Sequence, residues 1–412
     1  MVSITAGGHD ARTAETWTWI AIALGVTALL APPLAATALA VAAAMALGWS
    51  DPSIGFDSQW FAIAIALLSW LVFFYLRTQV LNQDGTMLTP KLERDVPLFG
   101  AHLTHDELLE LFVHSRMWYY TNRWWHWSVV FSYQVCSCIA GSVFVYGLVR
   151  LARRIVPTRR WLFIAGAVSG GYMQLFFGDV ENYTITAAIV LLYVLAAARF
   201  LARDGSLLTA LVTLAIAMCF HLEAGWLLPS AVYLLFVSHE RTRSWSESIR
   251  GTAAGAAIVA VVFVYFHFNG LPLWRFFSSH AGHALRASGV FAIGMPARYY
   301  VDQLNLLILL CPGIAMLMPF VVWRTRPADE TTAFLGVATI CMLLFQTVWK
   351  AQLGVFDDWN LYAIGGVIAS LLIWRYAATA AAMLPLRIAA AAIAVVGCIH
   401  TYSWILANHR PR

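Results

Sequence analysis

Long apolar stretches alternate with short polar segments along almost the whole chain. Many run for about 18–25 residues, the length a helix needs to cross a hydrocarbon core of about 30 Å. Strict two-residue alternation is absent, so the spans are expected to be helices rather than barrel strands. The pattern predicts about 11 to 13 transmembrane helices, with breaks expected at Pro32-Pro33 and near residue 222. The expected spans lie near residues 17–31, 34–49, 59–77, 125–149, 161–178, 183–202, 207–221, 224–238, 252–268, 303–323, 332–349, 359–375 and 382–406.

Composition supports an all-α polytopic membrane protein and indicates no second soluble domain. Hydrophobic residues make up 61% of the chain and charged residues 11%, whereas soluble domains carry roughly 25% charged residues. We therefore expect a single transmembrane domain over residues 1–412. The segment 1–16 lacks a basic n-region, so the apolar run after it is expected to be a retained helix. The net charge of +5 is typical of orientation and lipid contact and does not indicate a nucleic-acid partner.

Arginines cluster in four short loops, and the expected spans place all four on one face. Because basic residues are enriched in cytoplasmic loops, we interpret that face as cytoplasmic. The extracytoplasmic face then receives a first loop, 78–124, and a second large loop, 269–302. The loops hold Arg150, Arg153, Arg154, Arg159 and Arg160, then Arg199 and Arg203, then Arg241, Arg243 and Arg250, and last Arg324 and Arg326.

The first extracytoplasmic loop predicts an amphipathic helix that lies at the membrane surface. Thr104 is a suitable N-cap, and Glu107 stands at the capping-box position before a run of leucines. Aromatic residues between 118 and 127 favour an interfacial position for this helix.

Acidic residues are few, and those expected on the extracytoplasmic face come from five separate regions. Ionisable groups near a bilayer are costly to place and often mark function. Structural alternatives remain open for several of them, since Asp-Gly favours a turn and an acid at a helix start can serve as a cap. Glu181 differs, because a tight turn does not explain an acid followed by Asn182 and Tyr183 where a helix enters the membrane. These acids are Asp84, Asp106, Glu107, Asp179, Glu181, Glu223, Asp357 and Asp358.

Several segments resemble the GT-C superfamily of membrane glycosyltransferases. Residues 174–183 (QLFFGDVENY) resemble a QLFFGYVENY stretch of bacterial GT-C-like proteins, and residues 219–223 (CFHLE) resemble their CFHLSA segment. Residues 357–361 (DDWNL) are similar to a DWDLF motif, with an amide at position 360 in place of the second acid. In the first loop, residues 84–85 match the end of a GDG motif and 106–108 match a DEPL motif.

The resemblance implies a bacterial inner-membrane enzyme whose active site faces the extracytoplasmic side. It implies transfer of a sugar from a polyprenyl-phosphate donor to a glycan, lipid or protein hydroxyl, with inversion if displacement is a single step. A loop carboxylate would act as general base, because phosphate is already a competent leaving group. Asp84 is the expected base, and Glu107 or Asp106 is expected to support it.

The remaining candidates are expected to bind substrate, and no metal or other cofactor is expected. The phosphate is assigned to cationic side chains, since these stabilise its developing charge. The six cysteines lie in apolar runs without metal-ligand spacing. The phosphate candidates are Arg116, Arg298, His221 and Lys350, and the other substrate-binding candidates are Glu181, Asn182, Glu223, Asp357 and Asp358.

Two other functions remain open at this point. A polyprenyl-linked glycan flippase or transporter would need charges near mid-membrane and internal symmetry, and the sequence shows no internal repeat. A polysaccharide polymerase or ligase would depend on arginines of the large outer loop, where Arg275, Arg286 and Arg298 stand. A ligase should therefore lose activity when one of these arginines is replaced and should tolerate Asp84→Asn, which separates it from a transferase.

Overall fold

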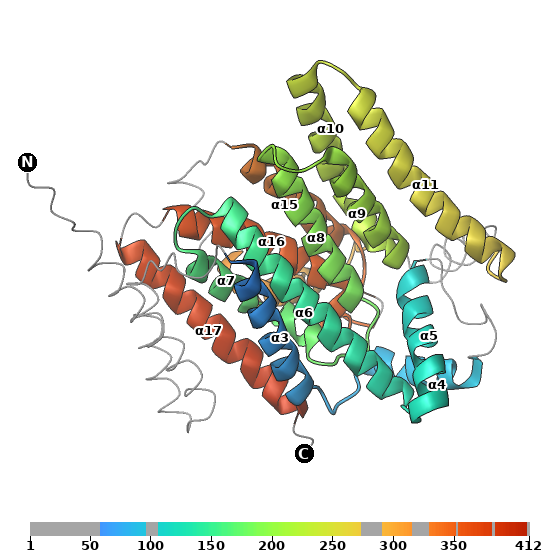
Figure 1. Cartoon of the computed structure of the whole chain (residues 1–412). Helices are drawn as coiled ribbons and strands as arrows, with labels where there is room; N and C mark the ends of the chain where they lie inside the picture. The colour runs from blue at the N-terminus through green and yellow to red at the C-terminus, as the bar shows by residue number, and fades with distance from the viewer. Residues whose placement is uncertain are drawn as a thin grey trace, which may run out of the picture.

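The computed structural model describes residues 58–95, 106–272, 291–314, 329–351, 353–380 and 384–409. These ranges are mostly helical and contain no β-strand, only an isolated bridge between Phe291 and Trp349. The helices pack against one another as a bundle (Figure 1). The predicted spans near 17–31 and 34–49 lie outside the described residues.

Six helices in this part of the chain are long and apolar enough to cross a membrane. The prediction of an all-α, integral, multi-pass membrane protein is therefore confirmed. The six are α6 (Val129–Ile155), α8 (Thr184–Leu201), α11 (Ser246–Phe268), α15 (Glu330–Val348), α16 (Ala363–Ala380) together with the short η4 (Trp359–Tyr362), and α17 (Leu384–His409). Two shorter apolar helices are α3 (Gln59–Tyr75) and α9 (Leu207–Phe220). Other helices are α4 (Gln83–Asp95), α5 (Leu108–Trp125), α7 (Arg160–Val168), α10 (Leu228–Thr242) and α13 (Ala297–Leu310).

The predicted span at 161–178 is wrong as a single helix. The chain forms α7 and then the short 3-10 helix η1 (Gly171–Phe176). At Gly170, between them, an added Cβ atom would lie 2.4 Å from the Leu310 carbonyl oxygen of α13. Only glycine permits so close a backbone approach. Near residue 222 the expected break is confirmed, because the 3-10 helix η2 (Leu222–Leu227) separates α9 from α10.

Two expectations for the first loop also change. The Asp84-Gly85 pair does not form a turn, because both residues lie in the first turn of α4. The amphipathic helix α5 begins at Leu108, so Glu107 precedes the helix and cannot complete a capping box at N3. Thr104, the expected cap, lies outside the described residues. The Glu107 side chain instead contacts other segments of the chain.

One end of the bundle joins the loop after α3 to segments far away in sequence. Thr78 N donates a hydrogen bond to Phe177 O (2.7 Å), and Gln79 N donates to Asn408 O in the last turn of α17 (2.9 Å). The first turn of α6 lies at this end, with α4 and α5 beside it (Figure 1). We call it the acid end, because it holds Glu107, Asn182, His221 and Glu223, which we call the acidic cluster.

The opposite end collects the C-terminal ends of α6, α8, α10 and α16, and we call it the arginine end. Arg241 Nη1 donates to Phe200 O (3.0 Å), which joins α10 to α8. Arg375 Nε donates to Ile155 O (3.1 Å), which joins α16 to α6. Three of the four predicted arginine loops therefore share one end, as expected. The fourth, with Arg324 and Arg326, lies outside the described residues.

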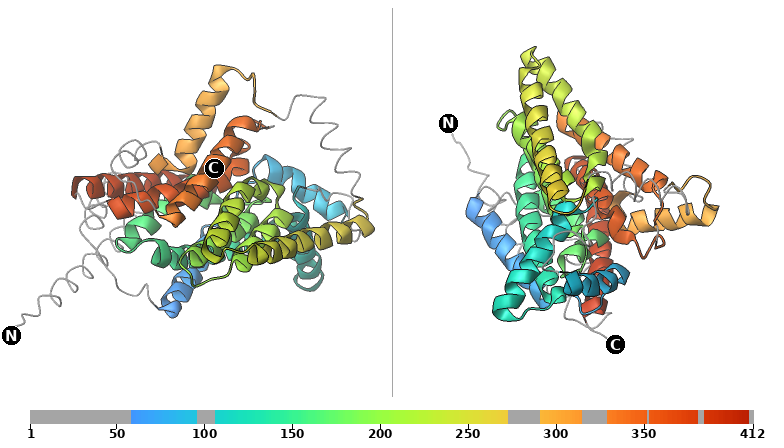
Figure 2. Two further views of the ribbon diagram at one scale, coloured as in Figure 1. Left: turned by 90° about the horizontal axis from the view of Figure 1, so that it is seen from above. Right: turned by 90° about the vertical axis from the view of Figure 1, so that its right-hand side faces the viewer.

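Burial differs strongly among the spanning helices. The η4–α16 span is 89% buried, whereas the α11 span is only 17% buried. Small residues let the central helices approach one another closely. At Gly166 of α7, an added Cβ atom would lie 1.9 Å from Trp374 of α16. In contrast, α13 projects from the body of the molecule (orange in Figure 2).

Candidate functional site

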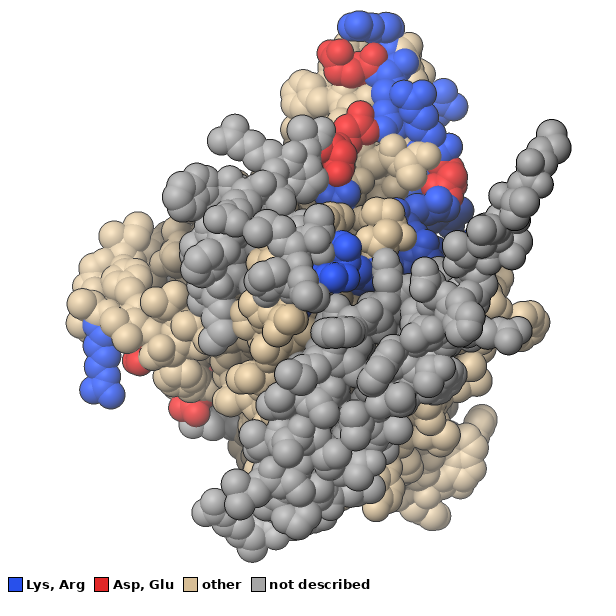
Figure 3. All heavy atoms as spheres, turned by 90° about the vertical axis from the view of Figure 1, so that its left-hand side faces the viewer, with Lys and Arg blue, Asp and Glu red and all other residues tan. Residues whose placement is uncertain are grey.

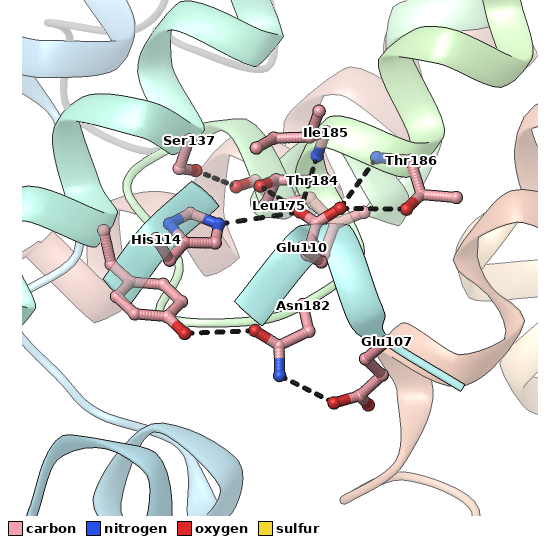
Figure 4. A network of polar contacts seen from close by, with 10 residues as sticks. Glu107, Glu110, His114, Ser137, Leu175, Asn182, Thr184, Ile185 and Thr186 are labelled. Atoms are coloured by element: carbon pink, nitrogen blue, oxygen red, sulfur yellow. Dashed lines mark hydrogen bonds and ion pairs between the residues drawn. The ribbon is translucent and has the colours of Figure 1, made fainter. Parts of the chain in front are cut away.

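Asn182 connects three elements at the acid end (Figure 4). Its Nδ2 donates a hydrogen bond to Glu107 Oε2 (2.9 Å) at the start of α5, and its Oδ1 accepts one from the Tyr133 hydroxyl of α6 (3.2 Å). The 177–183 segment turns sharply at Gly178, whose φ is +72°. An added Cβ atom there would lie 2.8 Å from Arg77 Cβ, so glycine is required. The turn positions Asn182 between the two helices.

Asn82 connects the same segment to the start of α4. Its Nδ2 donates hydrogen bonds to Glu181 Oε1 and, at 3.4 Å, to Asp179 Oδ1. Its Oδ1 accepts a bond from Gly85 N (2.7 Å), in the manner of a helix N-cap. An added Cβ atom on Gly85 would lie 3.2 Å from Val180 Cβ. The first turn of α4 is therefore packed directly against the 179–183 segment.

Asp84, the expected base, lies in this first turn of α4. Its backbone is adjacent to Gly85 and so to the contact with Val180. The position of its side chain lies outside what the structure describes. Its role as base therefore stays a prediction.

His221 lies between Glu107 and the backbone of Glu223. Its Nδ1 accepts a hydrogen bond from Glu223 N (3.1 Å), so we assign the ring proton to Nε2, which lies 3.7 Å from Glu107 Oε1. The Tyr183 ring covers the imidazole, with ring centroids 4.6 Å apart. Burial lowers the pKa of His221, but Glu107, together with Glu223 and Asp106, outweighs this effect, and the net pKa is raised. Glu107 thus holds Asn182 and His221 together.

Glu223 is a buried carboxyl group with both oxygens unsatisfied. Its side chain is 5% exposed, and neither oxygen has a hydrogen-bond partner among the described residues. It lies in η2, between the apolar helices α9 and α10. Burial raises its pKa from 4.5 to about 8, although the neighbouring His221 opposes the shift. At neutral pH the group is therefore mostly protonated and can donate a hydrogen bond.

Glu110 was not among the residues predicted from the sequence, but it accepts several hydrogen bonds at this end (Figure 4). Its carboxylate accepts hydrogen bonds from Ile185 N (3.0 Å), Thr186 N (3.2 Å) and the Thr186 hydroxyl (2.9 Å). A weaker contact joins it to Thr184 Oγ1 at 3.4 Å. These donors form the N-terminal turn of α8, where unsatisfied amides and the helix dipole favour an anion. Glu110 therefore caps α8 from α5.

His114 completes this structural pair. Its Nε2 lies 3.6 Å from Glu110 Oε1, and its ring stacks on Tyr133 with centroids 3.8 Å apart and an interplanar angle of 3°. Burial alone lowers the pKa of His114, but Cys136 and Glu110 raise it to about 9. At neutral pH the imidazole is therefore a cation beside the Glu110 carboxylate.

Four other predicted residues lie near η2, η4 and α13. The backbone carbonyl of Asp106 accepts a hydrogen bond from Leu222 N (2.8 Å), which places it beside η2. Asp358 Oδ2 accepts one from Leu353 N (3.0 Å) and precedes η4, while Asp357 is exposed. Lys350 lies next to Ala351, which bonds to Tyr299 of α13 rather than to the cluster.

Two other predicted phosphate ligands lie on α5 and at the start of α13. The Arg116 guanidinium carbon lies 5.5 Å from the Phe112 ring centroid and 5.9 Å from that of Tyr119, on the same helix α5. Six residues after Glu110, it points to a different face of that helix. Arg298 is exposed at the start of α13. Within the described ranges, no three His, Cys, Asp or Glu side chains are placed to hold a metal ion.

No protein-family model and no curated protein matches the chain. Solved structures do match it, over 84% of this chain and 76% of theirs. ArnT from Cupriavidus metallidurans bound to undecaprenyl phosphate matches with a TM-score of 0.56 and 13% identity. The apo state of the same protein matches with a TM-score of 0.54 and 13% identity. The likeness shows the fold, and the GT-C fold that the sequence resemblance predicted is confirmed.

Proposed function

We propose that the protein is a membrane glycosyltransferase that moves a sugar from a polyprenyl-phosphate donor to an acceptor hydroxyl. The observation that carries this proposal is the gathering of Glu107, Asn182, His221 and Glu223 at one end of a GT-C fold. A structure of similar fold holds undecaprenyl phosphate. The arginine end marks the cytoplasmic face under the positive-inside rule, so the proposed site faces the extracytoplasmic side of the membrane.

The chemistry needs one positioned base and a cation or hydrogen-bond donor for the phosphate. The sugar C1–O bond to phosphate breaks as the acceptor oxygen attacks C1, and the acceptor proton passes to a carboxylate. We assign Asp84 as that base, with inversion at C1 in a single displacement. The packing of α4 on the 179–183 segment supports the assignment, because Gly85, the residue after Asp84, lies against Val180, two residues before Asn182.

The described side chains would bind and orient the substrates. Glu107 fixes Asn182 and His221, so it is a positioning residue for both. A protonated Glu223 presents an O–H, which suits a phosphate or sugar oxygen, and His221 stays a candidate for the phosphate. Glu181, Asp357 and Asp358 stay candidates for sugar hydroxyls. Arg116, Arg298 and Lys350 stay candidates for the phosphate.

The test compares Asp84→Asn with a matched acid on the same helix. Glu93 of α4 is exposed, so Glu93→Gln controls for a change of charge on that helix. We expect Asp84→Asn to bind undecaprenyl phosphate as the unchanged protein does, since the base acts on the acceptor. Transfer from a panel of radiolabelled undecaprenyl-phosphate sugars should fall by about 10²–10⁴-fold. Glu93→Gln should keep both properties.

The outcomes separate the base assignment from the function. Full transfer by folded Asp84→Asn would show that Asp84 is not the base. Failure of the unchanged protein to bind undecaprenyl phosphate, measured by native mass spectrometry, would refute the glycosyltransferase proposal itself. A polymerase or ligase would instead tolerate Asp84→Asn and lose activity in Arg298→Gln.

A further inference from the structure

A cavity of about 250 Å³ opens at the arginine end, between α6 and α8. Two of its lining residues are Tyr146 and Leu195. The other four are the arginines Arg150, Arg153, Arg154 and Arg199. No carboxylate belongs to this lining. Lys and Arg side chains also gather over the upper part of the face shown in Figure 3. The proposed glycosyltransferase site makes no use of this cavity.

The cavity and the acidic cluster lie on opposite sides of the membrane. Tyr133 near one end of α6 contacts Asn182, and Arg154 near the other end lines the cavity. A separation of 21 positions along α6 corresponds to about 32 Å at about 1.5 Å per residue, close to the thickness of the hydrocarbon core. The cavity therefore lies at the opposite bilayer surface and is a separate site.

The helix dipoles of α6 and α8 do not by themselves explain all four arginines around the cavity. Arginines in the last turn of a helix are favoured by its dipole, which accounts for Arg153 and Arg154 on α6 and for Arg199 on α8. It does not account for Arg150, a full turn earlier, or for four guanidinium groups around one cavity. Asp204 pairs with Arg154 and lies 3.9 Å from Arg199 Nε.

The lining specifies the chemistry of the ligand. Guanidinium groups present planar pairs of N–H donors that match phosphate oxygens. A volume of about 250 Å³ corresponds to about eight water molecules, the size of a headgroup rather than of a drug-sized molecule. Tyr146 and Leu195 supply a less polar wall toward the membrane. Below them, α6 and α8 close together at Gly147, where an added Cβ atom would lie 3.2 Å from Leu191 Cδ2.

We propose that this cavity binds the phosphate group of an anionic phospholipid, with the lipid chains along the α6–α8 surface. A lipid suits the position better than a free anion, because the cavity lies at the bilayer surface and has an apolar wall. The bound lipid would join α6 to α8 at the end opposite the proposed active site.

The test measures lipid binding to delipidated protein in zwitterionic detergent by native mass spectrometry. Dioleoylphosphatidylglycerol is the anionic probe, and dioleoylphosphatidylcholine is the neutral one. The unchanged protein should bind the anionic lipid about tenfold or more tightly than the neutral lipid. Arg150→Gln/Arg199→Gln should bind the two lipids about equally. Arg243→Gln/Arg250→Gln removes two exposed arginines from the same end outside the cavity and should keep the preference.

Further measurements distinguish a lipid phosphate from free phosphate and control for misfolding of the variant. Arg150→Lys/Arg199→Lys keeps the charge, so it should retain a weaker preference even if the glutamine variant does not fold. Inorganic phosphate should not displace the lipid. Stronger binding of inorganic phosphate than of the anionic lipid would overturn the lipid assignment, as would equal loss in the Arg243/Arg250 control. Unchanged binding of undecaprenyl phosphate by the glutamine variant would confirm that the two sites are independent.

Discussion

Removal of the Glu110 carboxylate should destabilise the protein more than any loss of an exposed acid. Glu110 is fully buried and accepts hydrogen bonds from Ile185 N, Thr186 N and the Thr186 hydroxyl. In Glu110→Ala these donors lose their acceptor at the start of α8. His114 would also lose the carboxylate that helps to raise its pKa to about 9 in the folded protein, and its burial would then favour the neutral imidazole.

The expected cost follows from these losses. Breaking a buried ion pair by removing one partner costs about 3–5 kcal/mol. Each buried donor left unsatisfied costs about 1–3 kcal/mol, but these terms overlap, because water can enter the space that the side chain leaves. We therefore expect the free energy of unfolding of Glu110→Ala to fall by about 3–5 kcal/mol. The exposed Glu93→Ala on α4 should change it by less than about 0.5 kcal/mol.

The assay is reversible unfolding in mixed micelles, followed by tryptophan fluorescence at neutral pH. A double-mutant cycle with His114→Gln adds a specific check. Because the two side chains contact each other in the folded protein, the two losses should differ from additivity by about 1 kcal/mol or more. A loss below about 1 kcal/mol for Glu110→Ala, or strict additivity, would show that Glu110 does not cap α8 as described.

The structure also predicts the direction in which two other substitutions change the stability of the protein. The folded protein holds a proton on Glu223 between pH 4.5 and about 8 that the unfolded chain releases, so the free energy of unfolding falls as pH rises through that window. Glu223→Gln should flatten this slope in unfolding measured across the window, and an unchanged slope would contradict the assignment. Gly166→Ala should destabilise by about 1–3 kcal/mol or more because its Cβ atom would overlap Trp374. Gly336→Ala is the matched control, since nothing lies within 4 Å of a Cβ atom there, and equal melting temperatures for the two variants would refute the packing argument.

The spans and their orientation relative to one another could be predicted because hydropathy and charge are local properties of the sequence. Each spanning helix must satisfy its backbone within itself, so a long apolar run leaves few alternatives. The arginine loops at 150–160, 199–203 and 241–250 lie at one end for the same reason. The break in 161–178 could not be predicted in this way. It depends on the contact between Gly170 and the Leu310 carbonyl, 140 residues later, which no local pattern contains.

At the acid end, too, some residues could be predicted from the local sequence, and others depend on contacts with distant segments. Glu181 and Asn182 stood out because an acid and an amide at a helix entrance have no local explanation. Glu110 did not stand out, because a glutamate in an amphipathic helix is the expected polar residue on a solvated face. Its significance depends on α8, whose first turn begins 74 residues later and points its amides at the carboxylate.

The hydrogen-bond partners of each acid show whether its carboxyl group holds the fold together or can bind a ligand. The sequence alone does not distinguish these two kinds of acid. Glu110 accepts several hydrogen bonds from α8 and lies beside the His114 cation, so a substrate hydroxyl would have to displace bonds that hold the fold together. Glu223 is equally buried, but its oxygens lack hydrogen-bond partners among the described residues. Burial of an unsatisfied polar group costs free energy that a ligand can recover by bonding to it. We therefore expect Glu223, rather than Glu110, to gain a hydrogen bond when substrate binds at the acid end.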